Sequence, residues 1–333
     1  MNRDRCLSVP VLILILAAIC WWTPGLNAGE ADGVDAPYSK STYTYKVVDG
    51  LEIEADVYRA QGDEPRPAII WIHGGALIMG SKNGISDDQL QEYLGAGYTV
   101  VSIDYRLAPE TKLPGIIEDL RDAYAWIRSD GPGLFGIDPD RIAVIGHSAG
   151  GYLTLMAGFC LEPRPDALVA FYGYGDITGP WYSQPDSFYN LSPAVSEEQA
   201  FEVVGDTAIT SIEWGKGAEE REPFYLYCRQ QGIWPQLVAG HDPTDKNWYK
   251  AYEPIRNATS SYPPTMLLHG EKDTDVPFEQ SVMMAGELER NGVAHEFIHD
   301  PEWRHSFGHH SHGDTSFRRV YDRVLAFLAT HVN

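Results

Sequence analysis

The chain has 333 residues, of which 44% are hydrophobic and 12% aromatic, so it can build a large core and wholesale disorder is excluded. Its formal net charge of −22 argues against a nucleic-acid partner, because a phosphate backbone would be repelled. Four cysteines are too few for a scaffold built on disulfides.

The N-terminus has the pattern of a secretory signal peptide. Arg3 and Arg5 precede an almost wholly apolar run at residues 9–22, and a short polar stretch ends at the small residue Ala28. The apolar run is shorter than the roughly 20 residues that a spanning helix needs. We expect cleavage of residues 1–28, a secreted or periplasmic location and no stable membrane insertion afterwards. An uncleaved anchor is the alternative. Cleavage would leave two cysteines in the mature chain, Cys160 and Cys228. They either form a disulfide or remain two buried thiols.

The rest, residues 29–333, is expected to be one domain that opens with a hairpin. Residues 42–48 and 51–59 alternate apolar and polar side chains around Asp49 and Gly50, which indicates two antiparallel strands and a tight turn. Continuous apolar runs follow, and such runs are typical of strands buried on both faces of a parallel sheet. They lie at residues 67–72, 99–103, 142–145, 168–171, 266–268 and 297–298, the last within an eighth strand expected at residues 294–299.

Segments with helical periodicity separate these strands, at residues 85–94, 116–127, 150–158, 278–291 and 315–331. The alternation predicts an α/β sheet that is mostly parallel, with antiparallel strands at its beginning. It pauses at about residues 175–263, where aromatic residues are frequent. We expect an insertion packed over one end of the sheet. Its aromatic side chains either line a substrate pocket beneath a lid or form a small core of their own.

The most informative motif is RIAVIGHSAGGY at residues 141–152. A buried strand enters Gly-x-Ser-x-Gly and a helix leaves it, which is the context that a nucleophile elbow requires. The turn exposes the hydroxyl of Ser148, while Gly146 and Gly150 avoid collisions with adjacent backbone. The helix that follows directs its first amides toward developing negative charge.

A second motif, WIHGGA at residues 71–76, ends an earlier strand. Acyl transfer places negative charge on the former carbonyl oxygen, and backbone N–H groups must be preset to receive it. The residue after the nucleophile, Ala149, supplies one donor, and a glycine-rich loop after an upstream strand supplies the others. The loop of Gly74, Gly75 and Ala76 fits that role.

These motifs occur in an order that resembles the α/β-hydrolase superfamily. HGG at residues 73–75, DYRLAPE at 104–110 and GHSAGG at 146–151 are similar to the hormone-sensitive-lipase-like and bacterial feruloyl and acetyl-xylan-type esterases. The resemblance implies an eight-stranded, mostly parallel sheet, a triad of Ser, Asp or Glu, and His, and no cofactor. It also implies that the amides of Gly75 and Ala76 join that of Ala149 in an oxyanion hole. The family usually has a third glycine where this chain has Ala76.

The resemblance also selects the triad acid. In similar proteins it stands three residues after the glycine that ends the seventh strand and four before a proline, which points to Asp273. Its task is to accept the imidazole Nδ1 proton and to stabilise the imidazolium. Asp275 is the rival, and its simpler interpretation is a turn or cap residue before the next helix.

The base must follow the eighth strand, and His305, followed by a small residue and Phe, resembles the His-Gly-Phe of the family. The chain order Ser148, Asp273, His305 is that of the superfamily. His309, His310 and His312 are other candidates for the base. With His305 they form a histidine cluster whose spacing permits metal binding, but no carboxylate or thiolate pattern accompanies it, so we expect no metal.

The sequence therefore predicts a secreted serine carboxylic-ester hydrolase that forms an acyl-enzyme. Short-chain acyl or aryl esters are the expected substrates, either small molecules or acetyl and feruloyl esters linked to polysaccharide. The alternatives are a serine peptidase similar to prolyl oligopeptidase, a lipase at lipid surfaces, or a non-catalytic binding protein on a hydrolase fold.

Overall fold

The computed structural model describes residues 38–309 and 315–332. The predicted signal peptide, and His310 and His312, lie outside these residues.

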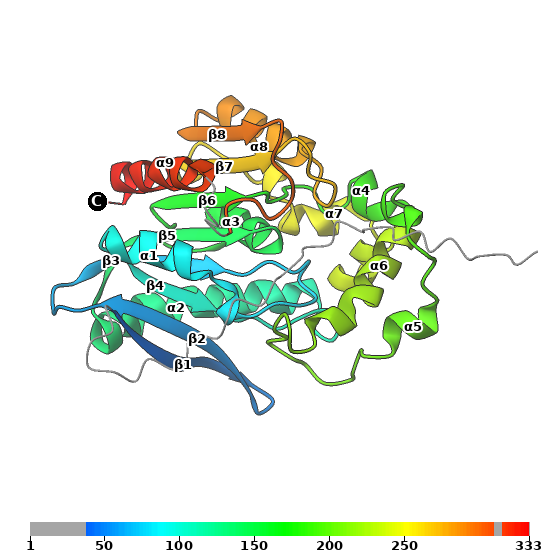
Figure 1. Cartoon of the computed structure of the whole chain (residues 1–333), viewed down its shortest axis with the longest axis horizontal. Coiled ribbons are helices and arrows are strands. Elements are labelled where there is room, and N and C mark those ends of the chain that lie inside the picture. The colour runs from blue at the N-terminus through cyan, green and yellow to red at the C-terminus, as the bar shows by residue number, and fades with distance from the viewer. Residues whose placement is uncertain (1–37, 310–314, 333) are drawn as a thin grey trace, which may run out of the picture.

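Eight strands form one sheet in the order β1-β2-β4-β3-β5-β6-β7-β8 (Figure 1). β2 runs antiparallel to both β1 and β4, and the other neighbouring strands are parallel. The predicted eight-stranded, mostly parallel sheet with antiparallel strands at its beginning is confirmed. The strands are β1 (Tyr38–Val48), β2 (Leu51–Ala60), β3 (Arg66–Ile72), β4 (Thr99–Ile103), β5 (Ile137–His147), β6 (Ala167–Phe171), β7 (Thr265–Gly270) and β8 (His295–Asp300).

The hairpin turn between β1 and β2 has the predicted chemistry. Asp49 and Gly50 have φ of 51° and 86°, so both central residues are left-handed, as the tight turns that suit twisted strands require. β1 begins earlier than predicted because its first residues also pair with β2, starting with Tyr38 opposite Ala60.

Helices cover both faces of the sheet (Figure 1). They are α1 (Asp87–Gly95), α2 (Leu113–Phe135), α3 (Ala149–Cys160), α8 (Glu279–Arg290) and α9 (Thr315–His331). Side chains of α1 and α9 share one hydrophobic core, and those of α2, α3 and α8 share the other. Strand residues alternate between the two cores: Ile70 and Ile72 face one, while Ile69 and Trp71 face the other. This double burial explains the continuous apolar runs.

The segment between β6 and β7 is an insertion of short helices beside the sheet, at the right of Figure 1. It contains α4 (Pro180–Ser183), α5 (Glu197–Phe201), α6 (Glu222–Gln231) and α7 (Lys246–Tyr249). One short 3₁₀ helix, η1 (Lys82–Gly84), precedes α1. The insertion also contains the 3₁₀ helices η2 (Tyr189–Leu191), η3 (Ala218–Arg221), η5 (Lys250–Tyr252) and η6 (Pro254–Arg256), and a π-helical turn, η4 (Pro235–Ala239).

Many aromatic rings of the insertion pack on one another. Tyr182 stacks on Trp234 at a centroid distance of 4.1 Å and on Trp181 at 3.6 Å. A buried ion pair fastens the insertion to the loop after β4: Arg221 Nη2 lies 2.7 Å from Glu110 Oε2, and the side chains are 1% and 2% exposed. Glu110 Oε1 also accepts the N–H of Gly205, at 3.0 Å.

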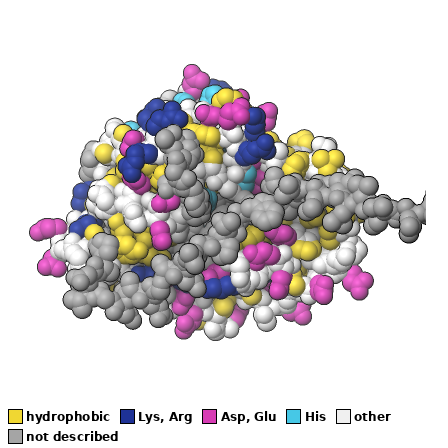
Figure 2. All heavy atoms as spheres, in the orientation of Figure 1, with side chains coloured by type: hydrophobic (Ala, Val, Ile, Leu, Met, Phe, Trp, Pro, Cys, Tyr) yellow, Lys and Arg dark blue, Asp and Glu magenta, His cyan; other side chains and the backbone are white. Residues whose placement is uncertain are grey.

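On the face drawn in Figure 2, acidic side chains are widely spread and basic ones stand among them. In the part of the chain that the structure describes, no helix is both long enough and apolar enough to cross a membrane. Cys160 and Cys228 are free thiols. Burial raises the pKa of both, that of Cys160 to about 12, so both thiols are protonated at neutral pH.

Candidate active site

Ser148 stands at a sharp turn between β5 and α3, with φ of 56° and ψ of −116°. An L residue adopts this conformation only where the surrounding structure imposes it. A Cβ added at Gly146 would lie 2.2 Å from the carbonyl oxygen of Gly150, and one added at Gly150 would lie 2.0 Å from that of Ile72. The predicted steric demand for glycine on both sides of the serine is therefore visible in the structure.

The structure brings the three predicted triad side chains together. His305 Nε2 lies 3.2 Å from Ser148 Oγ, and His305 Nδ1 lies 2.7 Å from Asp273 Oδ2. Because the carboxylate accepts a hydrogen bond from Nδ1–H, Nε2 of the neutral imidazole is left with a lone pair toward the serine hydroxyl. This is the arrangement in which an imidazole can remove a hydroxyl proton.

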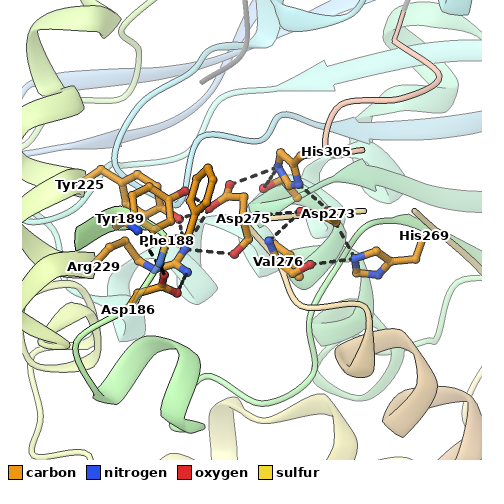
Figure 3. Close-up of polar contacts among 11 residues, drawn as sticks. Asp186, Phe188, Tyr189, Tyr225, Arg229, His269, Asp273, Asp275, Val276 and His305 are labelled. Atoms are coloured by element: carbon orange, nitrogen blue, oxygen red, sulfur yellow. Dashed lines mark hydrogen bonds and ion pairs between the residues drawn. The ribbon is translucent and has the colours of Figure 1, made fainter. Parts of the chain in front are cut away.

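Asp273 is held by four donors. Its Oδ1 accepts the backbone N–H groups of Asp275 and Val276, each at 2.9 Å, and its Oδ2 faces His305 and, at 3.3 Å, Nε2 of His269 (Figure 3). Burial alone would raise the pKa of this carboxyl. The charge of His305 and the hydrogen bonds from His269 and His305 outweigh burial and hold its pKa well below the usual range. Asp273 is therefore ionised when the imidazole becomes charged.

His269 is a site residue that sequence reasoning missed. It lies in β7, where Nδ1 is 2.7 Å from Ser281 Oγ and Nε2 is 3.0 Å from the carbonyl oxygen of Val276. The carbonyl accepts only, so the network assigns the proton to Nε2, which then also points to Asp273. No local signal distinguishes this histidine in the sequence, because its partners are set by the fold.

The candidate oxyanion donors lie beside the elbow. A Cβ added at Gly74 would be 3.3 Å from the Cβ of Ser148, so the loop after β3 lies directly against the serine. Gly75 and Ala76 have φ of 102° and 56°. Ala149 is the first residue of α3, where an N–H has no acceptor within the helix. Ala76 adopts the left-handed conformation for which the family usually has glycine.

The loops around the glycine motif are braced. His73 stacks on Tyr105 at a centroid distance of 4.2 Å, and burial lowers the pKa of His73 to about 4, so it is neutral. Arg106 pairs with acidic side chains: its Nη2 is 2.8 Å from Asp119 Oδ1 and 3.2 Å from Glu118 Oε2. These contacts hold the chain beside the proposed oxyanion donors.

The interpretation of Asp275 as a simple turn or cap residue is wrong. Its Oδ1 accepts hydrogen bonds from the hydroxyls of Tyr189 and Tyr225, at 2.6 and 2.5 Å, and from Nη1 of Arg229 at 2.9 Å. Its Oδ2 lies 3.3 Å from Nε2 of His305 (Figure 3). Asp275 therefore lies at Nε2 of His305, whereas Asp273 binds Nδ1 of the same ring. Residues of the insertion, far away in the sequence, turn it there.

The other histidines have separate surroundings. His309 lies with its ring centroid 4.6 Å from that of His147, and its carbonyl accepts the Ser86 hydroxyl. His299 Nδ1 is 2.8 Å from Glu271 Oε1. Within residues 38–309 and 315–332, no three His, Cys, Asp or Glu side chains are grouped so that they could hold a metal ion.

A family model described as an alpha/beta hydrolase fold matches residues 69–309. The chain belongs to the α/β-hydrolase family. The superfamily resemblance of the motifs is thereby confirmed, and the match runs from within β3 to His309, just after the candidate base.

Known proteins similar to this α/β-hydrolase differ widely in size. A non-reducing polyketide synthase of Emericella nidulans is 29% identical over 91% of this chain, which spans only 14% of that synthase. A solved Staphylococcus aureus protein of unknown function has a TM-score of 0.71 and 23% identity, covering 88% of this chain and all of its own. An acetyl ester-xyloside bifunctional hydrolase from Caldicellulosiruptor lactoaceticus has a TM-score of 0.63 and 20% identity, covering 87% of this chain and 96% of its own. At these identities the two structural likenesses concern the fold.

Proposed function

We propose that this α/β-hydrolase is a serine carboxylic-ester hydrolase that acts through an acyl-enzyme on esters with short acyl groups. The observation that carries the proposal is the continuous chain of contacts from Ser148 Oγ through His305 to Asp273. The acetyl ester named for the solved hydrolase of the same fold supports a short acyl group.

In the proposed first half-reaction, Ser148 Oγ attacks the ester carbonyl while His305 Nε2 takes its proton. Asp273 stabilises the imidazolium without being protonated itself. The amides of Gly75, Ala76 and Ala149 receive the negative charge on the former carbonyl oxygen. When the intermediate collapses, the bond to the alcohol oxygen breaks and His305 gives that oxygen the proton.

In the second half-reaction, water attacks the acyl-serine and gives a proton to His305. Release of the acid returns this proton to Ser148. The insertion supplies Tyr189 and Tyr225, which reach the site through Asp275, and this supports a role of the insertion as a lid over the substrate. The substrate is a small ester or one linked to polysaccharide.

We also infer export of the protein, on the basis of the apolar run at residues 9–22 after Arg3 and Arg5. Expression in a bacterial host followed by N-terminal sequencing of the exported protein tests this. A mature chain that begins at Gly29 is the expected result, and a protein that keeps Met1 and stays with the membrane would contradict it.

An ester panel with the variant Ser148→Ala tests the activity. Nitrophenyl esters of increasing acyl length, methyl ferulate, an acetylated xylan, a matched acyl thioester and a prolyl peptide substrate separate the substrate classes. We expect turnover of short acyl esters and a loss of at least ~10³-fold in kcat for the variant. Preference for the peptide would favour the peptidase, and equal rates for both proteins would refute the proposed nucleophile.

A further inference from the structure

The two oxygens of Asp275 have different surroundings. Oδ1 is occupied by three donors from the insertion, namely Tyr189, Tyr225 and Arg229. Oδ2 is turned toward the proposed catalytic centre and lies 3.3 Å from Nε2 of His305. The side chains of Asp275 and His305 are 22% and 14% exposed, so both remain accessible from outside.

In the state that starts the reaction, His305 cannot donate a proton to Asp275. Asp273 holds the proton of Nδ1, so Nε2 presents its lone pair to the hydroxyl of Ser148. Oδ2 of Asp275 and Nε2 of His305 are then both hydrogen-bond acceptors, and neither can donate to the other. Oδ2 is therefore suited to a donor brought by another molecule, because a carboxylate binds donors more strongly than a neutral acceptor does.

Asp275 is held firmly in this orientation. Arg229 is 1% exposed, and its guanidinium lies 4.3 Å from the ring centroid of Tyr189 and 5.6 Å from that of Tyr225. Its Nη2 pairs with Asp186 Oδ2 at 2.7 Å, on the side away from His305 (Figure 3). Burial raises the pKa of Tyr189 and Tyr225 well above the ordinary value, so both hydroxyls keep the protons that they donate. Such preorganisation lowers the entropy lost on binding.

The position of Oδ2 indicates which part of a substrate meets it. The leaving alcohol oxygen must come to Nε2 of His305 to receive its proton, so the alcohol part passes beside Oδ2 of Asp275. In an ester of a 1,2-diol, the hydroxyl on the second carbon from the ester oxygen lies roughly 2.8 Å from that oxygen when the two are gauche, which is about one hydrogen-bond length. It can donate to Asp275 while the ester oxygen faces His305.

We propose that Asp275 is a specificity-determining residue that binds a neighbouring hydroxyl of the alcohol part, so that the enzyme prefers esters of polyols to esters of simple alcohols. The inference rests on the proposed ester hydrolysis and adds the substrate class of the alcohol side. Partly acylated glycols, glycerol and sugars belong to this class.

The test compares two esters of similar size, 2-hydroxyethyl acetate and propyl acetate, which differ by a hydroxyl in place of a methyl group. The ratio of their kcat/KM values is measured by acid release for the wild type, Asp275→Asn and Asp186→Asn. Asp186→Asn is the matched control, since it removes the other carboxylate on Arg229 and leaves Oδ2 of Asp275 in place. Thermal unfolding is measured for each protein to detect loss of the fold. Asp275→Ala is a second variant that also removes the carboxylate, and its ratio should fall as that of Asp275→Asn does.

We expect the wild type to favour the hydroxyl ester by about 10-fold or more, as for a hydrogen bond to a charged acceptor. Asp275→Asn should reduce the ratio by about 10-fold, and Asp186→Asn should keep it. A wild-type ratio near one, or equal slowing of both esters in Asp275→Asn, would overturn the inference, because Asp275 would then act only through His305. If Ser148→Ala hydrolysed both esters like the wild type, the proposed function would fail instead, and the inference with it.

Discussion

His269 and Asp273 are four residues apart in the chain, and Nε2 of the histidine lies 3.3 Å from Oδ2 of the carboxylate. The histidine is fully buried and its other ring nitrogen is bound by Ser281, so its orientation is fixed. His269 thus acts on the proposed triad indirectly: it orients Asp273, and Asp273 in turn orients His305.

Replacing His269 with Ala removes a donor to Asp273 and should raise the pKa of that carboxyl toward its usual range. We expect kcat/KM to fall by ~10- to 100-fold, as for loss of a hydrogen bond to a charged group. Initial rates on a short acyl ester, taken well below the melting temperature of the variant, measure this. His299→Ala is the control, because His299 is half exposed and pairs with Glu271, not with Asp273, at the same end of the sheet. Full activity of His269→Ala would show that Asp273 needs no second histidine.

Gly150 is predicted to tolerate no side chain. In Gly150→Ala the new Cβ would meet the carbonyl oxygen of Ile72 at 2.0 Å, and backbone atoms cannot easily move away. Displacement of the elbow should lower kcat/KM by more than ~100-fold, because a misplacement of about 1 Å is enough for such a loss. Gly133→Ala in α2 is the contrasting variant: no atom lies within 4 Å of its added Cβ, and stability should rise by about 0.5–1 kcal/mol. Similar behaviour of the two variants in activity and thermal unfolding would count against this explanation.

Ala76→Gly tests the left-handed conformation of the proposed oxyanion loop. Relief of the strain of an L residue is worth roughly 1–2 kcal/mol, and the greater freedom of glycine in the unfolded chain offsets about 0.4–1 kcal/mol of it. We expect a net gain of about 0–1.6 kcal/mol in the free energy of unfolding, measured in urea. Leu77→Gly, at φ of 64° but fully buried, should instead lose stability because a core side chain is removed. A clear loss of stability in Ala76→Gly would contradict the assigned strain.

His73 should make stability depend on pH. Its pKa in the folded protein, about 4, is below the unfolded value of 6.5, so the folded state favours the neutral ring. The corresponding stability is fully present above pH 6.5 and is lost as the pH falls toward 4, by up to about 3 kcal/mol. In His73→Asn this loss should be absent, so the two stability curves should converge as the pH falls.

Urea unfolding of both proteins across this pH range provides the measurement. Burial raises the pKa of Asp104 to about 6, which works in the opposite direction, but that contribution is common to both proteins and cancels in the difference. Parallel curves would mean that His73 does not carry the titration.

The parts of the site that sequence could predict are those with a local cause. The glycines around Ser148 follow from the sterics of one turn, and a parallel sheet brings the ends of β5, β7 and β8 to one edge. Contacts that depend on distant elements could not be predicted. Asp275 turns toward His305 because Tyr225 and Arg229, in α6, fix its other oxygen.

Helix α2 shows the same limit at the level of the fold. Gly131, Pro132 and Gly133 are strong local signals for the end of a helix, and the predicted helix stops at residue 127. The structure continues it to Phe135, whose ring is buried, and ends it at Gly136 with φ of 62°. Pro132, Gly133 and Leu134 are exposed, so burial of the Phe135 ring is what outweighs the missing hydrogen bond of the proline.

Glu110 uses one carboxylate to fasten two places in the insertion, since Oε1 accepts from Gly205 and Oε2 pairs with Arg221. The segment from 205 to 221 is thereby tied at both of its ends to one side chain, by a hydrogen bond and an ion pair. Neutralising this one side chain would loosen both ends together and offer the segment to a protease. A substitution at Glu110 would thus change how firmly the insertion is attached without altering Ser148, His305 or Asp273.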